Sequence, residues 1–180
     1  MTTVTTNINI LIVDENPVLD LGSPIEAAIV REGVIIVLVF GPPLPSPYKY
    51  IADALAHPER YDESNRNVYG VATNGEILWR IKSVASPAHP WHSFNRILVA
   101  GELTLIETSA EAFFRLQPKT GAISVYPMPR NFREFAKQVR DRGEVLSWHP
   151  FRLRGNCPHP WPPNITIEHA RELLGQAEPQ

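Results

Sequence analysis

The chain has 180 residues, enough for one domain with a sizeable core, and its 43% hydrophobic and 20% charged content is ordinary for a folded protein. A formal net charge of -2 excludes the global positive field that gathers nucleic acid or an anionic membrane. The single cysteine, Cys157, excludes an intrachain disulfide framework. Since the N-terminus also lacks the pattern of a signal peptide, we expect a cytoplasmic protein that does not contact a membrane, and the charge balance disfavours a nucleic-acid partner.

The first predicted strand covers residues 8–13 and ends in a solvated Asp14-Glu15 turn. The phrase ILIVDENP resembles the opening strand and acidic pair of a response-regulator receiver. A receiver needs an amphipathic helix next, and Pro17 and Gly22 break this segment. The sequence therefore favours a plain strand and turn.

Two apolar runs, 25–30 and 34–40, flank Arg31-Glu32-Gly33 and predict a hairpin. The second run, VIIVLVF, shows no alternation of apolar and polar residues. Such a run is typical of a central strand that is covered on both faces.

The stretch from residue 67 to residue 82 contains the strongest hairpin signal in the chain. Two short apolar runs flank Thr73-Asn74-Gly75, and Asn-Gly suits the positive φ angles of a tight turn. In the second run, alternation predicts that Ile77, Trp79 and Ile81 face the core. We therefore expect a strand with a largely buried tryptophan.

Residues 113–126 repeat this pattern. Aligning Gly75 with Gly121 matches the two strands of each hairpin and leaves one extra turn residue in the second copy. The sequence thus predicts two similar hairpins at 68–81 and 113–126.

Other segments complete the predicted fold. Residues 96–100 and 103–107 form a strand pair around Gly101, and a short strand follows around Trp148. Helices are predicted at 47–56, 131–142 and 166–175 from their caps and apolar stripes. We predict an α+β fold, a mainly antiparallel sheet of paired hairpins backed by two or three short helices. Residues 1–154 would form one domain, followed by a proline-rich connector and C-terminal helix at 155–180.

The turn phrases VYGVATNGEILWRI and FFRLQPKTGAISVY resemble the hairpins of quinoprotein-type β-propeller repeats. A propeller needs at least four blades, so two copies in 180 residues imply neither that fold nor a quinone cofactor. The layout also resembles small uncharacterised bacterial proteins with an N-V-Y-x-V-x-x-x-G-x-I-L-W-x-I phrase and a second hairpin with a T-G turn. This resemblance implies an immunity-like or accessory role.

Histidines and the cysteine are the residues from which an enzyme site could be built. The candidates for a metal site or a nucleophile are His89, His92, His149, Cys157 and His159. None has the spacing of a known zinc motif, and no phosphate-binding or nucleophile-elbow motif is present. We predict no metal, cofactor or catalytic residue, and keep a small metal- or histidine-dependent hydrolase or nuclease as the alternative.

Two kinds of residue are candidates for binding. Arg133, Lys137 and Arg140 would share one face of the helix at 131–142, either as a solvated surface or as a docking face for an acidic protein partner or a nucleic-acid backbone. The loop aromatics Trp91, Phe94 and Trp161 would be exposed hot spots beside prolines, or a lid folded onto the sheet. We therefore predict a non-enzymatic binding protein that acts through protein–protein contact.

Overall fold

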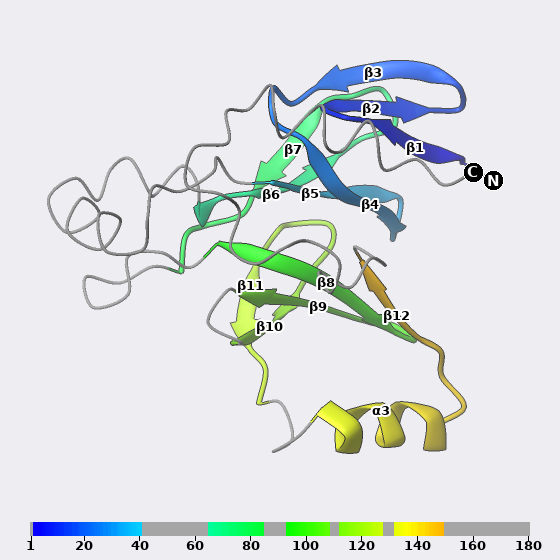
Figure 1. Ribbon diagram of the computed structural model, residues 1–180, viewed down its shortest axis with the longest axis vertical. Helices are drawn as coiled ribbons and strands as arrows, with labels where there is room; N and C mark the ends of the chain where they lie inside the picture. Colours follow the sequence, from blue (N-terminus) through cyan, green and yellow to red (C-terminus); the bar gives the residue numbers. More distant parts are fainter. Residues whose placement is uncertain (1, 41–64, 85–92, 109–111, 128–131, 150–180) are drawn as a thin grey trace, which may run out of the picture.

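The computed structural model describes residues 2–40, 65–84, 93–108, 112–127 and 132–149. These residues form four stacked layers, visible from top to bottom in Figure 1. The layers are a three-stranded N-terminal sheet, a four-stranded middle sheet, a five-stranded C-terminal sheet and a helix. All strand pairs in the three sheets are antiparallel.

The N-terminal sheet consists of β1 (Val4–Asn7), β2 (Ile10–Val13) and β3 (Asn16–Asp20) in sequential order. The predicted turn after β2 is confirmed, because Asp14 and Glu15 join β2 to β3 with φ angles of 47° and 65°. The predicted start of the first strand is wrong. Ile8 lies in the turn between β1 and β2 at a φ of 53°, and the separate strands β1 and β3 were not predicted.

The middle sheet has the order β4 (Ile25–Arg31), β5 (Val34–Val39), β6 (Val68–Val71) and β7 (Ile77–Arg80). Every residue of β5 is buried, as its uninterrupted apolar sequence predicts. Ile35 and Val37 pack against the N-terminal sheet, whereas Ile36 and Leu38 pack against the C-terminal sheet. Both faces of the strand are therefore core.

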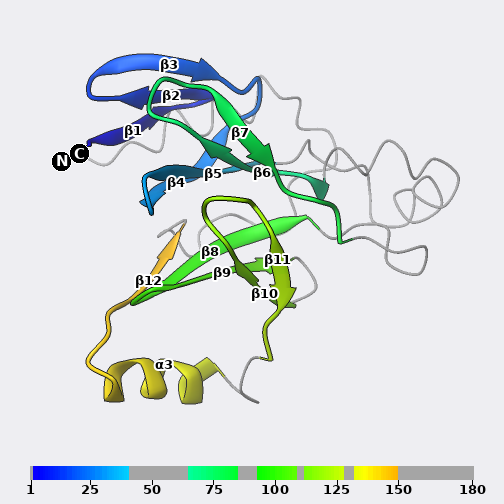
Figure 2. The ribbon, with the colours of Figure 1, turned by 180° about the vertical axis from the view of Figure 1, so that it is seen from behind.

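The C-terminal sheet has the order β11-β10-β9-β8-β12. Its strands are β8 (Phe94–Ala100), β9 (Leu103–Thr108), β10 (Phe113–Leu116), β11 (Ile123–Val125) and β12 (Leu146–His149). Ile97 and Ile106 face the middle sheet. Leu98 and Leu105, on the opposite face, pack against α3 (Phe132–Asp141). Figure 2 shows from behind that α3 lies on the side of the C-terminal sheet away from the middle sheet.

The two predicted hairpins are present, as β6–β7 and β10–β11. Each turn ends in a glycine with positive φ, 89° at Gly75 and 69° at Gly121. The Gly75 amide donates to the carbonyl of Ala72 at 2.9 Å, and the Gly121 amide donates to the carbonyl of Gln117 at 2.9 Å. The second turn is one residue longer, in agreement with the sequence alignment.

Trp79 joins these two hairpins. Its indole lies so close to two glycines that a Cβ would come within 2.0 Å of it at Gly70 and within 2.6 Å of it at Gly121. The indole Nε1 also donates to the Pro118 carbonyl at 2.8 Å. Trp79 is partly rather than largely buried, and it packs on the core between the middle and C-terminal sheets.

The predicted inward position of Ile77 is wrong. A bulge interrupts the pairing of β6 with β7 between Gly70 and Val71, so the strict alternation of β7 is lost. Ile77 and Leu78 are consequently both about half exposed, at 46% and 47%. Ile81 is fully buried as predicted.

Asn67 links the middle and C-terminal sheets by hydrogen bonds inside the core. Its side-chain amide donates to the carbonyls of Val39 at 2.9 Å and Phe94 at 2.8 Å, and its Oδ1 accepts from the Phe94 amide at 2.9 Å. Since the residue is only 3% exposed, losing these bonds would leave several buried polar groups unsatisfied.

The mainly antiparallel, hairpin-based character of the fold is confirmed, but the described strands form three sheets rather than the single predicted sheet. Within the described ranges, α3 is the one helix, rather than the predicted two or three, and the helices predicted at 47–56 and 166–175 lie outside those ranges. The predicted boundary between residues 154 and 155 lies outside them as well.

The contact of Trp79 with Gly121 can be tested by a pair of glycine substitutions. Gly121→Ala places a methyl group against the indole, whereas Gly22→Ala, at a similar φ of 66°, meets nothing within 4 Å. We expect Gly121→Ala to lower the free energy of unfolding in urea by more than Gly22→Ala does. In a Trp79→Ala background, itself costing about 3 kcal/mol, the two alanine substitutions should cost the same. An unchanged difference in that background would contradict the contact.

The β2–β3 turn predicts a stabilising substitution. Glu15 has a φ of 65°, where a side chain is strained and glycine is not. Glu15→Gly should therefore raise the unfolding free energy by up to about 1 kcal/mol, because relief of strain exceeds the entropy that glycine loses. Glu15→Ala, measured in the same thermal melts, should give no such gain.

Candidate binding surface

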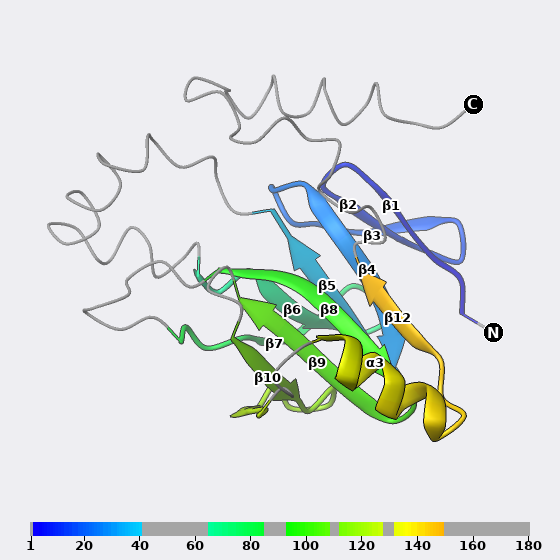
Figure 3. The same cartoon turned by 60° about the horizontal axis from the view of Figure 1, so that its bottom comes forward.

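Helix α3 is held on the C-terminal sheet by one apolar face. Phe135 and Val139 are each 1% exposed and pack on Leu98, Ala100 and Leu105. The Phe135 ring also contacts two other rings, with centroid distances of 6.1 Å to Tyr126 and 5.9 Å to Phe132. Figure 3 shows the helix in front of the C-terminal sheet. The predicted apolar stripe of this helix is thereby confirmed.

The helix ends at a glycine cap, as predicted. Gly143 has a φ of 72°, and its amide donates to the carbonyl of Arg140 at 2.8 Å. The Glu144 amide donates to the carbonyl of Val139 at 3.1 Å. These two bonds form a Schellman motif, which satisfies carbonyls that the helix end would otherwise leave open.

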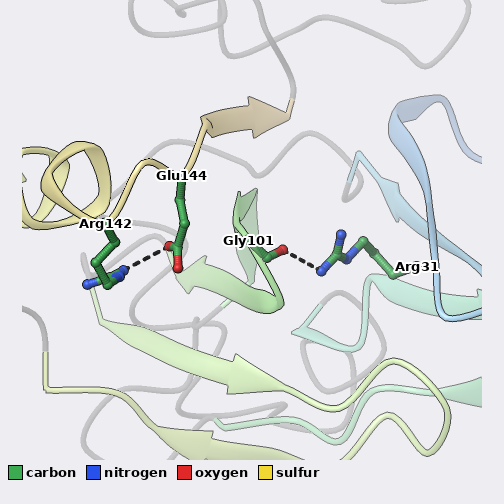
Figure 4. A network of polar contacts seen from close by, with 4 residues as sticks. All are labelled: Arg31, Gly101, Arg142 and Glu144. Carbon is green, nitrogen blue, oxygen red and sulfur yellow. Dashed lines mark hydrogen bonds and ion pairs between the residues drawn. The ribbon is translucent and has the colours of Figure 1, made fainter.

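A polar network extends from this cap to the middle sheet (Figure 4). Arg142 forms an ion pair with Glu144 at 3.0 Å, and hydrogen bonding to Glu144 raises the pKa of Arg142. The Glu144 carboxyl lies over the β8–β9 turn, since a Cβ at Gly101 would come within 2.9 Å of it. The Gly101 carbonyl accepts from Arg31 at the end of β4 at 2.7 Å. The helix end therefore lies close to the turn through which Arg31 joins the middle sheet to the C-terminal sheet.

The outward face of α3 carries the predicted cations. Arg133, Lys137 and Arg140 are all exposed. At 3.6 residues per turn their directions fall within about 60° of one another. In the part of the chain that the structure describes, no carboxylate forms an ion pair with any of the three. We call Arg133, Lys137 and Arg140 the cationic face.

This face differs from two nearby arginines, Arg96 and Arg142, which have carboxylate partners. Arg142 is balanced by Glu144, and Arg96 is balanced by the buried Glu107 across β8 and β9 at 3.3 Å. The acidic residues of α3, Glu134 and Asp141, project from a flank of the helix rather than from the cationic face. Positive charge is therefore concentrated on one strip of a rigid helix.

The prediction that Phe94 is an exposed binding residue is wrong. Phe94 is 1% exposed, begins β8, and packs edge-on against Phe114 at a centroid distance of 6.3 Å. The proline-rich segment before it suggested a loop, but the backbone bonds to Asn67 place Phe94 inside the sheet. Trp91 and Trp161 lie outside the described residues.

The histidine set can be located only in part. His149 lies in β12 opposite Ile97, and partial burial lowers its pKa below 6.5. His89, His92, Cys157 and His159 lie outside the described residues. Within those ranges, no three side chains of the metal-binding types gather into a possible site.

Sequence reasoning missed the residues that hold the binding surface in place. Arg31 and Glu144 looked like ordinary turn charges, and Asn67 looked like the start of a strand. Asn67 and Glu144 make their contacts with backbone far away in the sequence or with a glycine that leaves room for them. Gly101, in the β8–β9 turn, is the one local feature of the sequence that could have indicated a close contact there.

No protein family, curated protein or solved structure matches the chain. No helix of the described residues is long and apolar enough to cross a membrane. The resemblance to small bacterial proteins with propeller-like hairpins stays a prediction.

The lowered pKa of His149 predicts a pH dependence of stability. As the pH decreases, His149 is protonated at a higher pH in the unfolded chain than in the folded chain, because burial disfavours the charged imidazole. Stability should therefore fall as the pH decreases from 6.5 toward the folded-state pKa. His149→Gln should remove this part of the pH dependence in urea titrations, and an unchanged profile would contradict the assignment.

Proposed function

We propose that the chain is a non-enzymatic binding protein whose cationic face docks an acidic protein partner. The observation that carries this proposal is the concentration of Arg133, Lys137 and Arg140 on the exposed strip of α3. Charges that lack an internal partner are available to complement a partner, and they raise its rate of association.

The rigidity of α3 supports the same proposal. Its apolar face is buried on the sheet, and the Glu144 side chain at its C-terminal cap lies close to the β8–β9 turn. A docking helix that is already ordered loses little conformational entropy when it binds. The three cations can thus meet an acidic surface without a prior folding step.

A protein partner fits the charge balance better than nucleic acid does. The whole chain has a formal net charge of -2, so the positive strip is local and the rest of the surface would repel a polyanion. A compact acidic patch on another protein matches a strip of about two helical turns. The resemblance stated above makes the proposed role immunity-like or accessory, and the lone cysteine fits a cytoplasmic setting.

Charge reversal tests the proposal. The variant Arg133→Glu/Lys137→Glu should lose capture of its partner in pull-downs read by mass spectrometry. With the captured protein purified, the variant should associate at least about tenfold more slowly, with a weaker dependence on salt. The measurement is surface-based kinetics over a salt series.

A matched control separates this face from net charge. Lys82→Glu/Arg115→Glu makes the same change in net charge at exposed cations of other elements. It should bind like the native chain, and thermal melts should show all three proteins folded. If both double variants slow association equally, net charge rather than α3 governs binding; if neither does, the partner binds elsewhere.

A further inference from the structure

The β6–β7 turn carries a chemically unusual pair, Asn74 followed by Gly75. Asn74 is exposed, and its side-chain Oδ1 accepts a hydrogen bond from the Glu76 amide at 3.1 Å. An asparagine amide carbon is open to attack by the backbone nitrogen of the next residue, and a following glycine offers no side chain to hinder that attack. Asn74 is therefore intrinsically reactive.

The native turn opposes this reaction. The nitrogen that would attack is that of Gly75, and its N–H is held by the Ala72 carbonyl at 2.9 Å. The Gly75 backbone is also pressed against β3, since a Cβ there would come within 2.2 Å of the Val18 carbonyl. Rotating Gly75 toward the Asn74 side chain would break the hydrogen bond and disturb this contact.

The same hairpin lies at an edge of the middle sheet. Among the strands that the structure describes, β7 has a neighbour on one side only, and a bulge interrupts its pairing with β6. Ile77 and Leu78 remain about half exposed. Edge elements with few buried contacts are the parts of a fold that open most often without global unfolding.

We propose that Asn74 is a site of spontaneous deamidation that reacts when the β6–β7 hairpin opens. Its isoaspartyl product cannot adopt the native turn. The Gly75 nitrogen forms a bond to the Asn74 side-chain carbon and gives up its proton, and the side-chain amide leaves as ammonia. Water then opens the cyclic imide at either carbonyl. One opening gives aspartate, and the other gives isoaspartate, whose main chain runs through the former side chain.

The isoaspartyl product has one more main-chain atom than the native turn. An extra main-chain atom before Gly75 would displace that glycine from its hydrogen bond to the Ala72 carbonyl and from its close contact with Val18. Because the hairpin also carries Trp79, the misfit weakens the contacts of β7 with the C-terminal sheet. Formation of isoaspartate at residue 74 thus irreversibly weakens the packing of the β6–β7 hairpin.

Peptide mapping by mass spectrometry tests the proposal on the full chain. Samples are held in mildly alkaline buffer, one folded and one unfolded in urea, and aspartate and isoaspartate are quantified at residue 74. Asn7 and Asn95, which precede isoleucine and arginine, serve as internal controls. We expect residue 74 to react fastest in urea and at least about tenfold more slowly in the folded chain. Leu78→Lys, which replaces an apolar side chain of the edge strand by a charged one, should raise the deamidation rate of residue 74 in the folded chain.

Three results would overturn the proposal. Equal rates in folded and unfolded chains would show that opening is not required, and no reaction at residue 74 in urea would show that it is not a site. The third concerns Asn74→Asp, which adds the charge of the product without the extra main-chain atom. This variant should keep near-native stability while isolated isoaspartyl protein melts earlier. Equal melting of the two would refute the steric explanation.

Discussion

Double burial of the middle sheet is the constraint on which the other layers depend. All 6 residues of β5 are buried, so the strand has no face that water could contact. A sheet with two apolar faces needs a cover on each side, and the N-terminal and C-terminal sheets supply these covers. The C-terminal sheet is covered in turn by α3, whose outer side alone is charged. The position of the cationic face therefore follows from the burial of β5, because the sheet that covers β5 is itself covered by α3.

Polar groups fix how the layers sit on each other, which apolar packing alone does not specify. Asn67 bonds to backbone at the end of β5 and at the start of β8, and Arg31 bonds to the turn between β8 and β9. Arg31 ends β4 and Asn67 directly precedes β6, and both side chains reach from the middle sheet to the C-terminal sheet. Misplacing either layer would leave buried donors and acceptors without partners, and this cost selects one arrangement.

The sequence predicted what depends on neighbouring residues. Asn-Gly and Thr-Gly turns, the apolar run of β5 and the capped stripe of α3 are local patterns, and the structure contains each of them. The positions of Ile77 and Phe94 were wrong for non-local reasons. A bulge set by pairing with β6 turns Ile77 outward, and bonds from Asn67 draw Phe94 into the core. The cationic face was predictable because helical spacing alone creates it. The position of Glu144 beside Gly101 was not predictable, because the space that it occupies appears only after folding.

The uninterrupted apolar sequence of β5 also has a cost during synthesis. Its segment VIIVLV has strong β propensity, no charge and no proline, which is the composition of segments that assemble into fibrils. One of its two covers, the C-terminal sheet, begins at Phe94 and so leaves the ribosome well after β5 does. Until then the nascent chain exposes one face of an aggregation-prone strand. The nascent chain therefore most needs a chaperone between the synthesis of β5 and the synthesis of β8. Faster completion of the C-terminal sheet would shorten this interval.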